Sequence, residues 1–213
     1  TNNGTNWTQT SLNDKDIRSL AISGNNIFAG TTNPGGLYLS TNNGQNWTQT
    51  ALNNLSVYSL AISGNNIFAG TYYYGVYLST NNGASWTQTS LNDKTVRSLA
   101  ISGNNIFAGT SNSGVYFSTN NGTSWTQTAL NDKQVLSLSI SANNIFAGTN
   151  SGVYLSTNNG QSWILKNQGW NLVPLVRALL TANNYIFAGT ECYSVWRRPL
   201  SDIIGIQNIS SEI

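Results

Sequence analysis

Hydrophobic and polar positions alternate in short stretches along the chain, and the same pattern returns five times. Residues 17–23 read IRSLAIS, and related stretches stand at residues 57–63, 96–102, 135–141 and 175–181. A second stretch, IFAGT, follows each of them at residues 27–31, 67–71, 106–110, 145–149 and 186–190. Period-two alternation with β-branched and aromatic residues predicts β-strands. Helices are disfavoured, because no 3.6-residue apolar period persists and Gly, Asn and Thr are abundant.

A polar segment that ends in Trp separates successive groups of strands. The eight residues STNNGxxW begin at residues 40, 79, 118 and 156, so the repeat period is about 39 residues. The chain opens inside a further copy that ends at Trp7. Asn and Gly accept left-handed backbone, so Asn-Asn-Gly predicts a hairpin turn, which the Trp anchors by burying its ring. We call this segment the box and expect it to be scaffold rather than a ligand site.

Each repeat contains strands A, B and C, the box, and strand D. A period near 40 residues with four short strands predicts one blade of a β-propeller. The first D strand lies at the N-terminus, within residues 5–12, while the last C strand, residues 195–198, has no D strand after it. We therefore expect these two segments to pair. The predicted fold is an all-β, five-bladed propeller of four-stranded antiparallel blades, closed so that no sheet edge is exposed.

The box resembles the Asp-box, S-x-D-x-G-x-x-W, of BNR and sialidase-like propeller repeats. Every copy departs from that pattern by carrying Asn in place of Asp, at Asn42, Asn81, Asn120 and Asn158. The resemblance implies a propeller fold and raises sialidase-like glycoside hydrolysis as one function. However, sialidase relatives usually show six blades, an arginine triad and a Tyr and Glu nucleophile pair, and this sequence matches none of that pattern residue by residue.

The C-terminal residues break the repeat. Residues 195–213 resemble the segment that joins a propeller to a type IX secretion sorting domain in secreted proteins of the Bacteroidetes. We therefore divide the chain into a propeller over residues 1–200 and a linker or tail over residues 201–213, with an accessory strand under the propeller as the alternative for the tail. The resemblance implies a bacterial protein that is secreted or held at the cell surface. Because the chain lacks Met and opens within a repeat, we expect it to be a processed or excised fragment.

Composition excludes several classes of function. Charged residues make up 8% of the chain, against about 25% in typical domains, and the net charge is +2, so we expect no nucleic-acid partner. There is no His and only one Cys, Cys192, which argues against His-based catalysis, a disulfide and a Cys or His metal site. We expect no cofactor, no bound metal and no membrane span. A closed ring would leave the protein a monomer.

Differences between the repeats gather on one face of the predicted propeller, in the loops from B to C and at the entrance of strand A. Equivalent A-strand positions carry Arg18, Tyr58, Arg97, Leu136 and Arg177 and should ring the central channel. Arginines there would bind a carboxylate or sulfate by forked hydrogen bonds, and aromatic rings would offer flat faces to sugars. The predicted ligand-binding residues are Arg18, Tyr58, Arg97, Arg177, Tyr73 and Trp170, and the alternative is that they only cap the channel.

The sequence thus favours a secreted, non-enzymatic binding or interaction module for a glycan, an acidic small ligand or a cell-surface protein. Two alternatives stay open. One is a sialidase-like glycoside hydrolase, for which Asp16 and Glu191 would have to meet across the variable face as an acid and base pair. The other is a purely structural repeat module of a larger extracellular protein.

Overall fold

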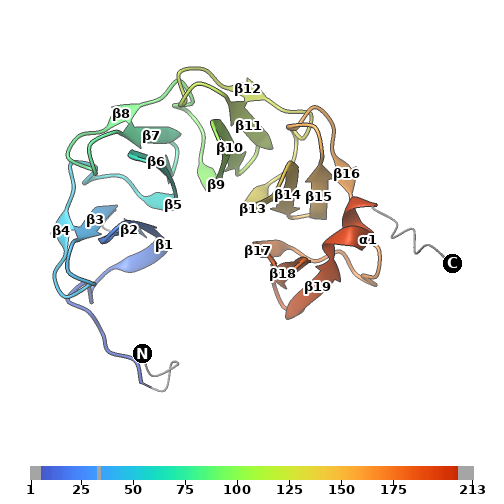
Figure 1. The fold of residues 1–213 in the computed structure, drawn as a ribbon, viewed down its shortest axis with the longest axis horizontal. Coiled ribbons are helices and arrows are strands. Elements are labelled where there is room, and N and C mark those ends of the chain that lie inside the picture. The colour runs from blue at the N-terminus through green and yellow to red at the C-terminus, as the bar shows by residue number, and fades with distance from the viewer. Residues whose placement is uncertain (1–5, 33–34, 206–213) are drawn as a thin grey trace, which may run out of the picture.

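Five antiparallel sheets follow one another along the chain and form an arc (Figure 1). The computed structural model describes residues 6–32 and 35–205. The first blade contains β1 (Asp16–Ser23), β2 (Asn26–Thr32), β3 (Gly36–Ser40) and β4 (Thr48–Gln49). The second contains β5 (Val57–Ser63), β6 (Asn66–Thr71), β7 (Val76–Ser79) and β8 (Thr87–Gln88). The third contains β9 (Val96–Ser102), β10 (Asn105–Thr110), β11 (Val115–Ser118) and β12 (Thr126–Gln127).

The fourth blade contains β13 (Val135–Ser141), β14 (Asn144–Thr149), β15 (Gly152–Ser156) and β16 (Ile164–Leu165). The last blade has three strands, β17 (Val176–Ala182), β18 (Tyr185–Thr190) and β19 (Val195–Pro199), and is followed by helix α1 (Leu200–Ile204). The inner strands β1, β5, β9, β13 and β17 line the hollow of the arc (Figure 1). The arrangement is that of a five-bladed β-propeller, as the repeat predicts.

The core lies between the blades. Where the first blade meets the second, Phe28 and Leu37 pack with Val57 and Ile67, and all four side chains are buried. Trp86, from the second box, packs against the same cluster. The equivalent cluster between the third and fourth blades contains Phe107, Val115, Val135 and Ile145, with Trp163 against it. Each interface therefore repeats the same side chains one blade further along, as expected for stacked repeats.

A glycine in the middle strand of each blade allows the next blade to approach closely. A Cβ atom added at Gly70 would lie 2.7 Å from Cγ1 of Val96, and one added at Gly109 would lie 2.6 Å from Cγ1 of Val135. The same relation holds for Gly30 with Val57 and for Gly148 with Val176. No real side chain fits at these separations. The valine at the start of each inner strand therefore occupies the space that a Cβ would take.

The box forms the turn that the sequence predicts. In the second blade Asn82 and Gly83 have φ angles of 56° and 84°. Ser79 Oγ accepts a hydrogen bond from the backbone N–H of Gly83 at 2.9 Å, and Asn81 Oδ1 accepts one from the N–H of Ser85 at 2.9 Å. Equivalent bonds recur in the other three complete boxes. The Ser and Asn side chains thus satisfy the turn's own backbone.

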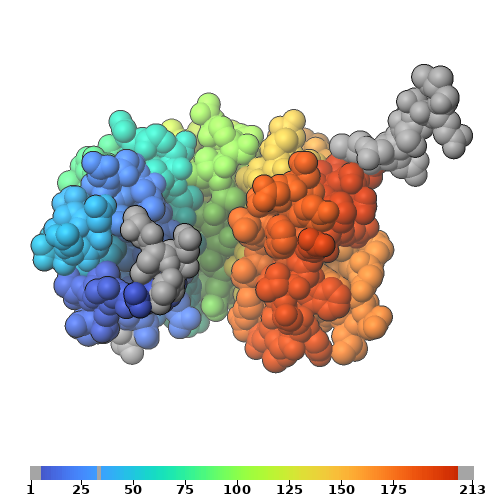
Figure 2. Space-filling model, turned by 60° about the horizontal axis from the view of Figure 1, so that its bottom comes forward, coloured from blue at the N-terminus to red at the C-terminus, as the bar shows by residue number. Residues whose placement is uncertain are grey.

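The predicted closure of the ring is wrong for the residues that the structure describes. The sheet of the last blade contains only β17, β18 and β19, and residues 6–12 form no strand. These residues instead run beside the first box, where Ser11 Oγ donates to the carbonyl of Gln45 at 2.9 Å. Trp7 is 91% exposed. The packing of each blade on the next fixes the curvature, and four such interfaces leave the first and last blades apart (Figures 1 and 2). Thr5, which the prediction included, lies outside the described residues.

The first residues of the predicted tail form helix α1 and pack on the last blade. Ile203 is buried in a cluster with Phe146, Val153 and Ile186, and Leu200 and Ile204 pack around it. The helix ends at Gly205, whose φ of 84° gives the left-handed C-terminal cap. Residues 206–213, the last part of the segment that resembles a secretion linker, lie outside the described residues.

The contact between Gly109 and Val135 gives a direct test of how the blades pack, because the three atoms nearest to an added Cβ there all belong to the next blade. We expect Gly109→Ala to destabilise the fold by about 1–3 kcal/mol, because the added methyl group overpacks the interface. The matched control is Gly189→Ala in the last blade, where only Ala178 lies within 4 Å of an added Cβ. Urea unfolding should show the loss for Gly109→Ala and almost none for Gly189→Ala. Equal losses would contradict this role for the glycine.

The box can be tested at Asn81, whose Oδ1 accepts from the N–H of Ser85 and whose Nδ2 donates to Ser85 Oγ. Asn81→Asp keeps an acceptor oxygen for the N–H of Ser85, and its second oxygen can accept from the Ser85 hydroxyl. The free energy of unfolding should therefore change by less than about 0.5 kcal/mol. Asn81→Leu removes the acceptor and should cost about 1–3 kcal/mol. Thermal melts of the two variants check this. The interpretation fails if the Asp variant is the less stable of the two.

Candidate functional site

Five residues at equivalent positions near the starts of the inner strands line one cavity. These are the residues that the sequence places at the mouth of the central channel, and the cavity has a volume of about 210 Å³. The lining residues are Arg18, Tyr58, Arg97, Leu136 and Arg177. Each comes from a different blade, so the site exists only because the blades are arranged around an axis. We call this cavity the mouth.

The three mouth arginines differ in their partners. Arg177 donates from Nη2 to Oε2 of Glu191 at 2.6 Å and from Nε to the same oxygen at 3.0 Å. Arg97 donates from Nε to Ser111 Oγ at 2.9 Å. No hydrogen bond or ion pair joins the side chain of Arg18 to another described residue. Among the described residues that line the mouth there is no carboxylate, so an excess of positive charge remains there after Glu191 has paired with Arg177.

Aromatic rings extend from the mouth onto the second blade. The guanidinium carbon of Arg97 lies 4.9 Å from the ring centre of Tyr58, a cation–π distance. The ring of Tyr58 meets that of Tyr72 edge-on at 5.6 Å, and Tyr72 lies 4.1 Å from Tyr73. A hydrogen bond with Tyr73 raises the pKa of the Tyr72 hydroxyl, so this hydroxyl stays protonated at neutral pH. The rings form an uncharged aromatic surface beside the arginines.

Two of the six predicted residues therefore sit differently from the prediction. Tyr73 is 62% exposed and reaches the mouth only through Tyr72, which is the ring that contacts Tyr58. Its backbone, with φ of 66°, is held by a hydrogen bond from its N–H to Thr95 Oγ1. Tyr72 stands in the same three-tyrosine loop, but the sequence does not show which ring points inward. The pairing of Arg177 with Glu191 was likewise not predicted.

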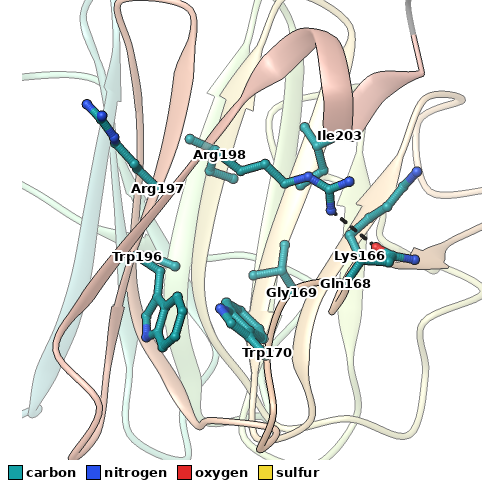
Figure 3. Close-up of a pocket in the computed structure, with 11 residues that line it drawn as sticks. Lys166, Gln168, Gly169, Trp170, Trp196, Arg197, Arg198 and Ile203 are labelled. Atoms are coloured by element: carbon teal, nitrogen blue, oxygen red, sulfur yellow. Dashed lines mark hydrogen bonds between the residues drawn. The ribbon is translucent and has the colours of Figure 1, made fainter.

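Trp170 does not lie among the residues that line the mouth. It lines a larger cavity of about 370 Å³ between the fourth and last blades, which we call the outer cavity (Figure 3). Trp170 and Trp196 stand edge to face with their ring centres 6.1 Å apart. Above them, Arg198 Nη1 donates to Gln168 Oε1 at 3.2 Å (Figure 3). The last repeat has no box, and Ile203 of α1 forms part of the cavity wall instead.

The outer cavity has a signal in the sequence, although it is a weak one. Trp196 stands where the other blades carry Tyr38, Tyr77, Tyr116 and Tyr154. Arg197 replaces the Leu or Phe that precedes the other boxes, and Arg198 replaces the Ser that begins them. The change of residue type shows that this repeat is different. It does not show that a cavity forms.

Three of the remaining acids form ion pairs with a neighbouring lysine. Lys133 Nζ lies 2.9 Å from Asp132, and its hydrogen bond lowers the pKa of that carboxyl group. Similar pairs occur at equivalent turns, between Lys15 and Asp14 and between Lys94 and Asp93. A lone cysteine is usually a buried apolar residue, but Cys192 is free and exposed, with φ of 66°. Within residues 6–32 and 35–205, no group of three His, Cys, Asp or Glu residues is placed to hold a metal ion. No helix in that part of the chain is long and apolar enough to cross a membrane.

Comparison with known proteins gives similarity at the level of structure. No protein-family model matches the sequence, and no curated protein matches it. An ancestral GH74 enzyme superposes with a TM-score of 0.75 and 26% identity, over 89% of this chain and 30% of that one. The extracellular domain of a putative one-component system from B. thetaiotaomicron gives 0.71 and 21%, over 89% of this chain and 29% of that one.

A third similar structure is YCF48 bound to D1 peptide, with a TM-score of 0.66 and 16% identity over 86% of this chain and 65% of that one. The chain spans less than a third of the GH74 enzyme and of the extracellular domain. At these identities the likeness concerns the fold and not the activity. Five sheets of three or four antiparallel strands, together with these similar structures, show that the chain has the β-propeller fold.

Proposed function

We propose that the chain is a non-enzymatic binding module that takes an acidic ligand, such as a glycan carrying carboxylate or sulfate groups, at the mouth. The observation that carries this proposal is the convergence of three guanidinium groups from three blades on one cavity without a lining carboxylate. Arginine is suited to this task, because its planar group donates two parallel hydrogen bonds to a carboxylate or sulfate. Arg18, which has no partner among the described residues, is the group best placed to meet the ligand.

The tyrosines beside the mouth support a ligand with a ring. Tyr58 and Tyr72 present ring surfaces next to Arg97, and Tyr73 extends them outward. Aromatic rings stack on the flat apolar faces of sugars, while nearby charged groups select the substituents. A ligand that combines a sugar ring with an acidic group matches both features of the surface.

Catalysis is the weaker alternative. Glycoside hydrolysis needs two carboxyl groups that flank the scissile bond. Glu191, one of the two acids considered for this role, is engaged by Arg177, and no carboxylate is among the described lining residues of the mouth. An ancestral GH74 enzyme is among the similar structures, but this chain spans only 30% of its length. We therefore propose ligand binding and not glycoside hydrolysis at the mouth.

An extracellular location fits this function. Extracellular domains are among the similar structures. The box resembles the Asp-box of BNR repeats, and the C-terminal segment resembles linkers of secreted proteins. We therefore propose a secreted or surface-held bacterial protein, in which the boxes serve as scaffold and the mouth as the binding site.

Binding at the mouth is tested with a glycan array that pairs neutral glycans with their uronic-acid, sialic-acid and sulfated counterparts. We expect the protein to retain the acidic members and not the neutral ones. Arg18→Ala should weaken binding about 10- to 100-fold, because a charge-assisted contact contributes about 1.5–3 kcal/mol. Arg97→Ala should act in the same direction while leaving the melting temperature nearly unchanged. Arg198→Ala, in the outer cavity, is the matched control and should bind normally.

The pairing of Glu191 with Arg177 provides a test in the opposite direction. Glu191→Gln removes the negative charge that competes for Arg177, so the affinity for an acidic glycan should rise. The gain should be only a few-fold, because exposed ion pairs contribute at most about 1 kcal/mol. Isothermal titration against a glycan from the array measures it. Retention of no acidic glycan, or binding unaffected by both Arg18→Ala and Arg97→Ala, would remove the proposed function and favour a structural module.

A further inference from the structure

The two ends of the arc expose faces that are buried in every other blade. At the start of the first blade, Ile17 is 40% exposed, whereas its equivalents Val57, Val96, Val135 and Val176 are fully buried. Leu20 and Ile22 of the same strand are 65% and 69% exposed. The equivalent Leu60 and Ile62 of the second blade pack into the interface with the first. The first blade thus presents an interface surface that no other blade covers among the described residues.

The last blade presents the opposite half of that interface. Val195 of β19 is 69% exposed, although its equivalents Leu37, Val76, Val115 and Val153 are buried. Gly189 corresponds to the glycines that receive a valine from the next blade, and no such residue lies within 4 Å of its Cβ position. The slot at Gly189 and the exposed side chain of Ile17 are therefore the two unmatched halves of one repeated contact.

In the part of the chain that the structure describes, the last blade also lacks an outer strand, while the N-terminal segment has the sequence of an outer strand but pairs with no sheet. The last blade stops at β19, whose outer edge pairs with no strand among the described residues. Residues 7–12 read WTQTSL and match the outer-strand segments WTQTAL and WTQTSL at residues 47–52 and 86–91, yet they form no strand. An open edge of this kind is where an extended segment adds to a sheet.

The first box contains a buried hydrogen-bond donor, Trp47 Nε1, whose equivalents in the third and fourth boxes bond to the preceding blade. Trp125 and Trp163 donate from Nε1 to Thr89 Oγ1 and Thr128 Oγ1, which belong to the outer-strand segment of the preceding blade. Trp86 donates to the carbonyl of Gly83 instead, while Trp47 Nε1 is buried and has no acceptor among the described residues. The residue before the first blade that is equivalent to Thr89 and Thr128 is Thr10. Its Oγ1 accepts from the N–H of Leu12, as Thr50 Oγ1 accepts from the N–H of Leu52 in the paired first blade. Residues 7–12 thus share a local bond with a paired outer-strand segment, although they form no strand.

We propose that the last blade of one copy of this chain docks on the first blade of a second copy, and that residues 8–9 of the second copy complete the sheet beside β19. The register follows from the first blade, where Tyr38 pairs with Gln49 and Leu39 with Thr48. Trp196 of one copy then faces Gln9 of the other, and Arg197 faces Thr8. Ile17 enters the slot at Gly189, as valines do between the other blades.

A second copy is the occupant because it carries the required surface in full. The established blade interfaces bury these side chain types in this arrangement, so the docked faces continue the existing packing. Within one chain the two faces are held apart by the curvature of the arc (Figures 1 and 2). The expectation of a monomer assumed a closed ring, and the open arc removes that assumption. Because the contact joins two different faces, it repeats from copy to copy.

Cross-linking between two differently labelled chains tests the register. Both carry Cys192→Ser; one also carries Gln9→Cys and the other Trp196→Cys. The pair Tyr38 and Gln49, on which the design is based, is flanked by the hydrogen bond from Thr50 N–H to Leu37 O at 2.8 Å, so it is a non-hydrogen-bonded pair with close Cβ atoms. Mild oxidation of the mixture should join the two variants. Asn13→Cys, off the register, replaces Gln9→Cys in the control and should give little product.

The oligomeric state in solution tests whether the two end faces dock. Light scattering should show a shift from one chain to two or more as the concentration of the full chain rises. Ile17→Asp should abolish this shift, whereas Ile164→Asp, at an exposed position on β16 outside the proposed contact, should leave it unchanged. A single-chain mass at every concentration would overturn the proposal. So would a disulfide that forms only within one chain carrying both Gln9→Cys and Trp196→Cys, because β19 would then hold its own N-terminal segment.

Discussion

The contact between the valine that begins each inner strand and the glycine in the preceding blade is the constraint on which the other features depend. An added Cβ at any of these four glycines would come within 2.7 Å of the valine side chain, so the two sheets can approach this closely only without one. The close approach allows Phe, Leu and Ile side chains to fill the space between blades. It also sets the angle between successive blades, and with it the curvature that brings five strand starts around one mouth.

The mouth shows how a nearly invariant scaffold can carry a variable surface. Each of its five lining residues immediately follows the Val or Ile near the start of an inner strand. Their side chains line the mouth and belong to none of the buried clusters between blades, so Arg, Tyr and Leu all fit the same backbone. The box lies outside the mouth and keeps its Ser, Asn and Gly because the turn's own hydrogen bonds require them.

The repeated elements were predictable from the sequence because every repeat carries the same local residue patterns. Alternation located the strands, Asn-Asn-Gly located the turns, and equivalence between repeats placed Arg18, Arg97 and Arg177 around one cavity. What the sequence did not predict depends on distances between non-equivalent parts. The position of Trp170 depends on α1, which replaces the box in the last repeat. Ring closure depends on the combined effect of the four interfaces between blades, and the repeat shows only that these interfaces are alike.

The way the blades pack also determines how the molecule loses its structure. Each inner strand packs mainly on the inner strand of the next blade, so the fold behaves as a linear array with nearest-neighbour coupling. The end blades have one neighbour each, while the third blade has two on either side. Local opening should therefore begin at β1 and at β17 and proceed inward, with backbone amides of β10 exchanging last with solvent. Stability in such an array belongs to the interfaces, and it grows with each neighbour that an end blade gains.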